Sequence, residues 1–402
     1  MTYEWNHSTI NDVCVLVTDG SHSSPKSVND GKYMVSVKDF TDYGFDFASC
    51  RMISNDDYET LKRNGCVPQI DDILIGKDGA RFFEDIIIYR QREKPALLSS
   101  IAILRCDKSK ILPDFLYYVL RTPSFRQDVK DNYGSGSAIP RIILKDFKRM
   151  MVSYPSLEKQ QAIISVLTAI DSKIQANTEI NDNLEQQAQA IYHERFETVS
   201  PNDLPSDWRI VTLGEVATIS NKSFNPLKEP EILLEHYSIP AFDEARFPVF
   251  ELSTSIKSNK FIIDASCFMI SKLNPTTKRV WKPYCLTGNA VCSTEFIVYK
   301  AKDQSITDFL YSVIDSGSFS DFMCSHVTGS TGSRQRTTPS DTLSYELILP
   351  SEDELAEFQS LVSPMYAQMR INAIENDKLK RLRDSLLPKL MSGEIDVSAI
   401  QL

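Results

Sequence analysis

The segment NTEINDNL at residues 177–184 recurs as NAIENDKL at residues 372–379, which is an offset of 195 residues. Four positions are identical in the two segments, and two of these are asparagines that lie four residues apart. A single match of this length can arise by chance, so the flanking sequence decides whether the chain contains a repeat.

Further matches lie in the same order in both halves of the chain. The tetrapeptide DFLY at residues 114–117 recurs at residues 308–311 with an offset of 194, and Pro155 recurs as Pro350 with an offset of 195. One inserted residue accounts for the change in offset. An ordered series of this kind predicts two copies of one unit of about 195 residues.

A heptad pattern surrounds the repeated asparagines. From residue 163 to 191, and again from 355 to 386, alternating steps of three and four residues land mainly on apolar side chains. Asparagine at such a position costs stability but fixes the register, because a shifted pairing leaves its amide unsatisfied. We therefore predict two long helices that pair with each other within the chain. Their register would be set by Asn177, Asn181, Asn372 and Asn376. The alternative is two amphipathic helices that pack separately on their own domains.

Pro364 lies inside the second heptad pattern. Proline in the interior of a helix removes a backbone hydrogen bond and kinks or breaks the helix. We therefore expect the segment before Pro364 to form a separate short helix.

The remainder of each copy has the pattern of β structure. Runs such as residues 72–75, 85–89 and 294–299 are rich in β-branched and aromatic residues. One helix with apolar residues at helical spacing should follow in each copy, at Pro113–Lys130 and at Asp308–Ser325. The predicted fold class is α+β: two β-rich globular domains joined by two long helices, which form an intramolecular antiparallel coiled coil in a pseudo-twofold tandem repeat.

The composition limits the possible functions. The 402 residues include 44 Lys+Arg and 54 Asp+Glu, and the net charge of −10 argues against non-specific adhesion to nucleic acid or to an anionic membrane. The start of the sequence lacks a basic segment followed by an apolar one, and there is no apolar run of about 18 residues, so we expect a cytoplasmic protein without a membrane partner. The eight cysteines form no C-x-x-C motif, and we expect buried free thiols.

Sequence motifs for catalysis are missing. There is no G-x-x-x-x-G-K-[ST] phosphate loop, and the two Asn-Pro pairs lack the following proline and aromatic residue of an amino-methyltransferase. The five histidines show no metal-ligand spacing. We therefore expect no catalytic residue, no metal site and no cofactor, which leaves binding as the function.

Basic residues gather at two places in each copy. The first cluster consists of Lys77 and Arg81 in one copy and of Lys272, Lys278 and Arg279 in the other. The second cluster accompanies a Gly/Ser-rich loop and consists of Ser135, Ser137, Arg141 and Lys145 in one copy and of Arg334, Gln335 and Arg336 in the other. Loop N–H groups and hydroxyls bind phosphates, while Arg recognises guanine and Gln recognises adenine in the major groove. We predict DNA binding by these residues, with solvated loops as the alternative.

The junction between the first β-rich part and its helix resembles the specificity (S) subunit of type I restriction-modification enzymes. The segment VSYPSLEKQQAI at residues 152–163 is similar to the strand, proline and L-E-x-Q-x-x-I helix start of that family. Residues 170–174 and 177–184 are similar to its helix body, and LLPKLMSGEI at residues 386–395 is similar to its C-terminal end.

The resemblance implies a non-catalytic DNA-binding subunit. It implies target recognition domains at residues 1–154 and 200–350, a central helical spacer region at 155–199 and a C-terminal one at 351–402. The implied partners are double-stranded DNA with a bipartite asymmetric target, two methyltransferase (M) subunits and, in the complete complex, two restriction/translocase (R) subunits. Two alternatives stay open: a coiled-coil scaffold without DNA sequence specificity, and a fused restriction-methylation protein with its own catalytic activity.

Overall fold

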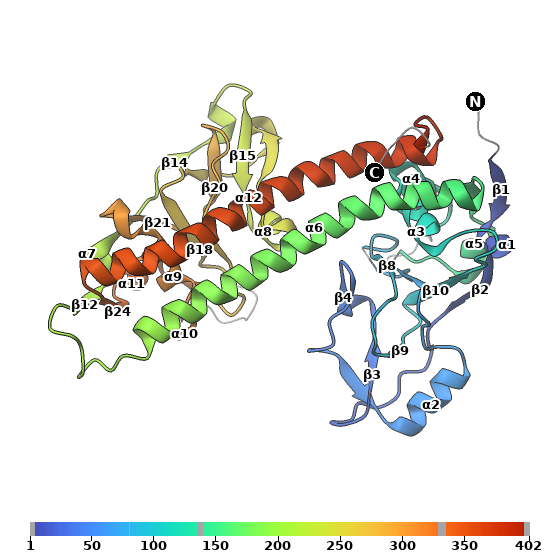
Figure 1. Ribbon diagram of the computed structural model, residues 1–402, viewed down its shortest axis with the longest axis horizontal. Helices are drawn as coiled ribbons and strands as arrows, with labels where there is room; N and C mark the ends of the chain where they lie inside the picture. The colour runs from blue at the N-terminus through green and yellow to red at the C-terminus, as the bar shows by residue number, and fades with distance from the viewer. Residues whose placement is uncertain (1–4, 80, 135–139, 329–334, 398–402) are drawn as a thin grey trace. The chain divides into compact units, whose positions relative to one another are not determined.

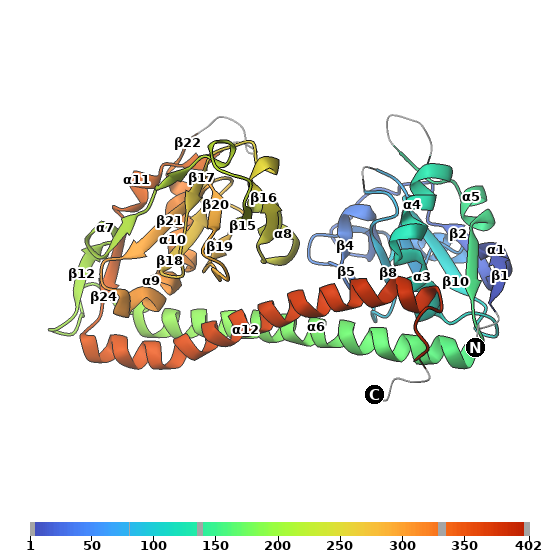
Figure 2. The same cartoon turned by 90° about the horizontal axis from the view of Figure 1, so that it is seen from above.

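Two long helices extend through the protein. The structure is a computed structural model that describes residues 5–79, 81–134, 140–328 and 335–397. The long helices are α6 (Leu157–Tyr192) and α12 (Glu352–Met391). Both are seen from two directions in Figures 1 and 2.

The chain forms two compact units. The first unit comprises residues 1–172 and 379–402, and the second comprises residues 173–378. Both boundaries fall inside the long helices, so each unit contains one β-rich part together with a segment of α6 and a segment of α12. The predicted boundaries at residues 154, 199 and 350 instead separate β-rich from helical segments along the chain.

The first unit is built on a four-stranded antiparallel sheet with strand order β2-β10-β7-β8. Its central strands are continuous apolar runs, which suit a sheet that is covered on both faces. A three-stranded sheet with order β6-β3-β9 and the strand pairs β1-β11 and β4-β5 complete the β structure. The strands are β1 (Asn6–Thr9), β2 (Cys14–Asp19), β3 (Lys32–Val35), β4 (Phe40–Thr41), β5 (Gly44–Phe45), β6 (Arg51–Ile53), β7 (Ile73–Gly76), β8 (Ile86–Ile88), β9 (Ala96–Leu97), β10 (Ile101–Cys106) and β11 (Met151–Tyr154).

The second unit contains a matching sheet with strand order β13-β21-β18-β19. Beside it lie a five-stranded sheet with order β14-β17-β20-β15-β16 and the strand pairs β12-β24 and β22-β23. The strands are β12 (Arg209–Thr212), β13 (Ala217–Ile219), β14 (Ser223–Phe224), β15 (Leu233–Tyr237), β16 (Val249–Leu252), β17 (Lys260–Ile262), β18 (Cys267–Ser271), β19 (Val280–Trp281), β20 (Ala290–Ser293), β21 (Phe296–Ala301), β22 (Val327–Thr328), β23 (Arg336–Thr337) and β24 (Glu346–Leu349).

Short helices occur in the same order in both units. Those of the first unit are α1 (Ile10–Val13), α2 (Asn55–Arg63), α3 (Pro113–Arg121), α4 (Pro123–Asn132), α5 (Leu144–Arg149) and a 3-10 turn at Val37–Asp39. Those of the second are α7 (Leu213–Val216), α8 (Ile239–Ala245), α9 (Thr307–Ile314), α10 (Gly317–Ser325), α11 (Pro339–Thr342), 3-10 turns at Pro226–Lys228, Ser253–Ser255 and Gln304–Ile306, and a π-helical turn at His193–Glu197. The predicted α+β tandem repeat with two long helices is confirmed.

The prediction of a single helix at Pro113–Lys130 and at Asp308–Ser325 is wrong in both copies. Each place holds two helices, α3 and α4 in the first unit and α9 and α10 in the second. Thr122 and Ser316 have extended backbones, and their side chains accept a hydrogen bond from the first turn of the following helix. A residue in this N-cap conformation ends the preceding helix and starts a new one.

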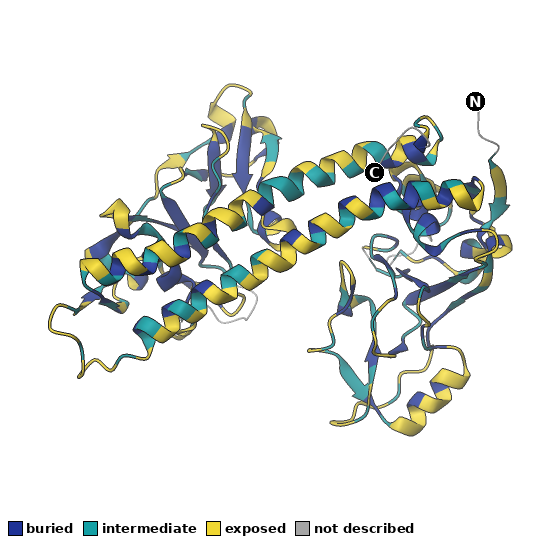
Figure 3. Ribbon diagram, in the orientation of Figure 1, coloured by how far each residue is buried: buried dark blue, intermediate teal, exposed yellow. Residues whose placement is uncertain are grey.

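The hydrophobic core of each unit includes its segments of the long helices. In the first unit, Leu167 of α6 and Leu390 of α12 are fully buried in the same cluster as the sheet. In the second unit, Tyr192 of α6 and Phe358 of α12 are buried in the cluster that covers the second sheet. The buried positions recur along one side of each long helix, as Figure 3 shows. The helices are therefore integral to both cores.

The segments of α6 and α12 in the second unit pair in opposite directions. Asn177 donates to Asn376 Oδ1 at 2.9 Å, and Asn372 donates to Asn181 Oδ1 at 2.8 Å, so the residue numbers rise in one helix while they fall in the other. Asn177 also donates to Glu375 Oε2 at 2.7 Å, and its side chain is almost fully buried. The four asparagines thus form two hydrogen-bonded pairs across the helix pair, while Asn177 Oδ1 is buried without a partner among the described residues.

The prediction of a separate short helix before Pro364 is wrong, because α12 is continuous from Glu352 to Met391. Pro364 lies on the exposed side of the helix, and so does Ser360, whose carbonyl loses its partner and can be hydrated there. On the opposite side, Val362 and Tyr366 are buried in the core on either side of the proline. Packing of these residues offsets the missing hydrogen bond.

Candidate nucleic-acid interface

The turn after a central strand is bridged, in both units, to the segment that follows the Gly/Ser-rich loop. Asp78 forms an antiparallel bridge with Arg141 in the first unit, and Leu273 forms one with Arg336 in the second. Both residues of the second bridge lie 195 positions after those of the first. The structure therefore brings together the two basic clusters that the sequence predicted in each copy.

The backbone of this bridge has the same geometry in both units. The N–H of Gly79 donates to the carbonyl of Pro140 at 3.0 Å, and the N–H of Asn274 donates to that of Gln335 at 3.0 Å. Gly79 has a φ of 97° and Asn274 a φ of 49°. Glycine and asparagine adopt this left-handed conformation at the lowest cost. The two units therefore share the backbone conformation of this turn but differ in its side chains.

Lys77, at the start of the first turn, belongs to the interior of the first unit. Its side chain is only 2% exposed, and its Nζ lies 3.4 Å from Asp19 Oδ2 and 3.7 Å from Asp78 Oδ1. A buried charge needs partners of this kind. The arrangement suits a residue that holds the turn in place, so Lys77 is left out of the proposal below.

The other predicted residues of the first unit lie at its surface where they are described. Arg81 is exposed, with its guanidinium 2.9 Å from Asp85 Oδ1. Arg141 and Lys145 are exposed as well. Ser135 and Ser137 lie outside the described residues. The side chain of Arg81 is 72% exposed and that of Asp85 is 22% exposed.

Two predicted residues of the second unit are held by carboxylates of the same unit. The Nζ of Lys278 lies 2.8 Å from Asp315 Oδ1, and Arg279 forms a two-pronged pair with Asp243 at 2.5 and 2.9 Å. The side chain of Arg279 is largely buried. These geometries suit residues that stabilise the fold.

Arg336 is the exposed cation of the second bridge. Its guanidinium donates to both carboxylate oxygens of Glu295, at 3.0 and 3.2 Å, and this pairing raises the pKa of Arg336. Position 100, the equivalent of 295 in the first unit, is a serine. The two bridges thus present different side chains. Lys272 and Gln335 are half-buried beside this bridge. Arg334 lies outside the described residues.

Sequence reasoning missed the residues that join each β-rich part to the long helices. Gln160 is fully buried in α6, where it accepts from the N–H of Leu112 at 2.8 Å and donates to the carbonyls of Lys110 and Pro155. It is the glutamine of the L-E-x-Q helix start, and that motif was the signal for it. The glutamine ties three loop backbone groups to the first turns of the helix.

A second set of contacts between the β-rich part and the long helices includes charged residues in the first unit. Asp171 of α6 accepts from the hydroxyl of Tyr118 at 2.7 Å and from Arg383 of α12 at 2.9 Å. The equivalent place in the second unit carries a bond of 2.7 Å between the hydroxyls of Ser312 and Tyr366. The repeat relates these positions, at offsets of 194 and 195, and was the signal that could have found them.

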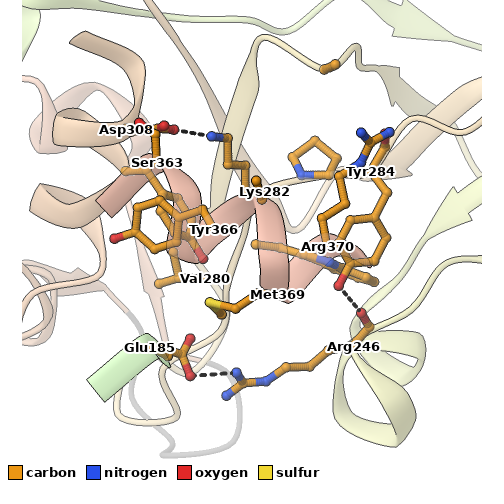
Figure 4. Close-up of a pocket in the computed structure, with 15 residues that line it drawn as sticks. Glu185, Arg246, Val280, Lys282, Tyr284, Asp308, Ser363, Tyr366, Met369 and Arg370 are labelled. Carbon is orange, nitrogen blue, oxygen red and sulfur yellow. Dashed lines mark hydrogen bonds and ion pairs between the residues drawn. The ribbon is translucent and has the colours of Figure 1, made fainter. Parts of the chain in front are cut away.

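The second unit has a cavity of about 310 Å³ between its β-rich part and its helix segments. Figure 4 shows that the charged residues in its wall pair with one another, Glu185 with Arg246 and Lys282 with Asp308. Arg370 donates to the backbone carbonyl of Tyr284 at 2.9 Å. The contacts of Glu185 and Arg370 anchor the β-rich part to α6 and α12.

Over the part of the chain that the structure describes, no three His, Cys, Asp or Glu side chains are grouped to hold a metal ion, and no helix is long and apolar enough to span a membrane. The eight cysteines are free thiols, but the expectation that all are buried is wrong. Those that are half-buried are Cys14, Cys50, Cys285 and Cys324.

Comparison with known proteins agrees with this architecture. The family profile of the type I restriction modification DNA specificity domain matches residues 3–186. The specificity subunit of the MjaIX enzyme of Methanocaldococcus jannaschii is 25% identical over 322 residues, which cover 73% of this chain and 71% of the relative. That of the HindI enzyme of Haemophilus influenzae is 23% identical over 369 residues, which cover 73% and 80%. The crystal structure of a type I S subunit from M. genitalium shares the fold, with a TM-score of 0.56, 16% identity and 96% coverage of both chains.

The fold and the matching domain define a DNA-recognition protein of a restriction-modification system. Residues 3–186 match that specificity domain, and the chain is similar over about three quarters of its length to specificity (S) subunits of type I restriction-modification enzymes. Its fold is that of a type I S subunit.

Proposed function

We propose that this S subunit recognises a bipartite, asymmetric DNA target through the bridged turns of its two units. The observation that carries the proposal is the bridge itself, which recurs at Asp78–Arg141 and at Leu273–Arg336. In both units it places an exposed arginine next to a Gly/Ser-rich loop. Exposed arginines suit phosphate contacts and contacts to base edges.

The difference between the two bridges supports an asymmetric target. Arg336 is paired with Glu295, whereas the first unit has Ser100 at the equivalent position. A guanidinium held by a carboxylate must exchange that partner for a base, and the exchange favours some sequences over others. Two units with different side chains on one scaffold should therefore recognise two different half-sites.

The repeat also supports the recruitment of two identical catalytic partners. A chain with pseudo-twofold symmetry offers equivalent surfaces to two copies of one subunit. We propose that these copies are M subunits, which supply methyl transfer, and that R subunits join them in the complete complex. The S subunit itself would contribute recognition and no catalysis.

The test combines the purified chain with a type I M subunit and selects bound duplexes from a randomised library. We expect two fixed half-sites of different sequence around a spacer of fixed length, and one S to two M by native mass spectrometry. A bound pool without sequence preference would support a scaffold instead.

Activity of the S subunit alone is the second arm of this test. The purified chain is incubated with duplex DNA and S-adenosylmethionine, and separately with duplex and ATP. We expect neither methylation nor cleavage. Methyl transfer by the chain alone would show a fused enzyme and would contradict the proposed division of labour.

A further inference from the structure

A second cavity, of about 230 Å³, lies in the first unit between the start of α4 and the C-terminal segment of α12. Its wall contains three arginines and one carboxylate. The lining residues are Tyr118, Arg121, Pro123, Arg126, Arg383, Asp384 and Leu387. The arginines outnumber the carboxylate, so the charge of the cavity depends on which arginines are paired with carboxylates elsewhere in the unit.

Arg383 is neutralised within the protein. Its guanidinium donates to Asp171 at 2.9 Å and to Asp384 at 2.9 and 3.0 Å. The two carboxylates raise the pKa of Arg383. This arginine forms a fixed wall of the cavity and contributes no excess charge.

Arg121 and Arg126 have no such partner. The guanidinium of Arg121 lies over the ring of Tyr117, 4.9 Å from its centroid, and donates to the Tyr117 hydroxyl. Arg126 donates to the backbone carbonyl of Glu84 at 3.1 Å. Within the described residues, neither arginine forms an ion pair with a carboxylate.

The environment of Arg126 favours a bound anion. Its Nε is buried and has no hydrogen-bond partner among the described residues. Burial and the charge of Arg121 lower the pKa of Arg126, and Glu84 and Asp85 offset this only in part. A buried donor and two neighbouring like charges are costly when no acceptor is present.

The start of α4 adds to the positive potential. Pro123, which lines the cavity, is the first residue of this ten-residue helix. The N-terminal end of a helix carries a partial positive charge. The helix end and the two arginines therefore favour the same kind of ligand.

We propose that this cavity binds a phosphate group, either free or carried by a nucleotide. Planar guanidiniums donate in pairs to phosphate oxygens, and a bound phosphate would give Arg126 Nε its acceptor and separate the two like charges. Tyr118 and Leu387 are buried and form an apolar floor.

The second unit serves as an internal comparison. Asp315 and Ser320 stand at the positions equivalent to Arg121 and Arg126. Asp315 is buried and faces Lys278. The repeat therefore preserves the helix break but inverts the charge, so the proposed site belongs to the first unit alone.

The test measures binding of inorganic phosphate, and separately of a nucleoside monophosphate, to the full chain by isothermal titration calorimetry against chloride at equal ionic strength. We expect millimolar affinity or better, and a loss of at least tenfold in Arg126→Gln and in Arg121→Gln. Lys130→Gln is the matched control, because it removes one positive charge from the same helix and lies outside the cavity. Its affinity should stay within twofold.

The two ligands distinguish the sources of the phosphate. Tighter binding of the monophosphate supports a nucleotide, and equal binding supports free phosphate. Phosphate that binds no better than chloride, or equally to the parent and both Gln variants, overturns the proposal. Arg121→Gln keeps the test decisive if Arg126→Gln does not fold, since among the described residues the guanidinium of Arg121 contacts the side chain of Tyr117 and forms no ion pair.

Discussion

The junction between β-rich part and helices differs in chemistry between the two units. In the first, Tyr118 and Arg383 both donate to Asp171, so a charged group of three residues joins α3, α6 and α12. In the second, Ser312 and Tyr366 stand at the positions of Tyr118 and Asp171 and share one neutral hydrogen bond. The same backbone plan therefore carries a charged junction in one unit and a neutral junction in the other.

The two units also differ in the residue that faces Asp171, or its equivalent, from the other long helix. Arg383 lies there in the first unit, and the equivalent residue of the second is Ala188, fully buried against an aromatic cluster. If the helix segments exchanged partners, the arginine would enter this apolar cluster without its carboxylate. Such a mispairing is costly, so the difference in chemistry specifies which segments pair.

The largest expected effect follows from breaking the charged junction. Asp171→Ala leaves the buried phenol of Tyr118 without its acceptor and removes one of the two carboxylates from the largely buried guanidinium of Arg383, which keeps Asp384. Removal of one partner from such a pair costs about 3 kcal/mol, whereas Tyr366→Phe removes one neutral hydrogen bond and should cost about 1 kcal/mol. Urea unfolding, with hydrogen exchange to assign the loss to a unit, measures both. Equal costs would show that the charged group is no stronger than its neutral counterpart.

A smaller effect concerns pH and the second unit. Burial raises the pKa of Asp315 to about 6, from an ordinary value of 3.8. The folded state then binds more protons than the unfolded state between these values, so stability falls as pH rises from about 4 to about 6. The loss from this group should be on the order of 2–3 kcal/mol.

Asp315→Asn should flatten this part of the pH profile. The comparison is the difference between parent and variant in urea unfolding at a series of pH values, since other carboxyls titrate in the same range. An unchanged slope in Asp315→Asn would show that the carboxyl is not the source.

The third prediction compares the two bridges in DNA recognition. Arg141→Ala and Arg336→Ala should each weaken binding of the S–M complex by about 1–3 kcal/mol if the arginine contacts a base. Each variant should relax selectivity at one half-site only, and the two half-sites should differ. Selection from a randomised duplex library shows both effects. Loss of affinity without loss of selectivity would indicate a phosphate contact instead.

The sequence predicted the repeat, the long helices and the fold class because these depend on patterns that persist over many residues. The heptad pattern and the paired asparagines were sufficient for α6 and α12. The prediction from sequence failed at Pro364, because tertiary packing of Val362 and Tyr366 outweighs a local helix breaker on the solvent side. The sequence analysis also missed the helix breaks at Thr122 and Ser316, where the hydrogen bond of one N-cap side chain starts a new helix.

The candidate interface was predicted in part. Sequence clusters located the turns that the bridges join, since basic residues and Gly/Ser-rich composition are visible in the sequence. The sequence could not show that Lys77 is buried or that Arg279 is paired with Asp243, because these partners lie far away in the chain. Burial and pairing of charges are tertiary properties.

The smallest expected effect concerns the asparagines of the helix pair, and it separates stability from register. Asn376→Leu removes the acceptor that Asn177 uses at 2.9 Å, while Asn177 keeps its bond to Glu375. We expect a loss of about 1 kcal/mol in urea unfolding. The double variant Asn177→Leu/Asn376→Leu removes both amides, and it should recover this loss or exceed the parent, because apolar residues replace a buried polar pair at little cost.

If the asparagines fix the register, the double variant should nevertheless form additional species, since only the Asn181–Asn372 pair then opposes pairing out of register or between chains. Light scattering during size-exclusion chromatography detects such species, with Lys378→Leu as a control at a neighbouring exposed position. A double variant that is more stable than the parent and has an unchanged, single oligomeric state would show that packing alone sets the register. The asparagines would then be tolerated in the helix pair without specifying it.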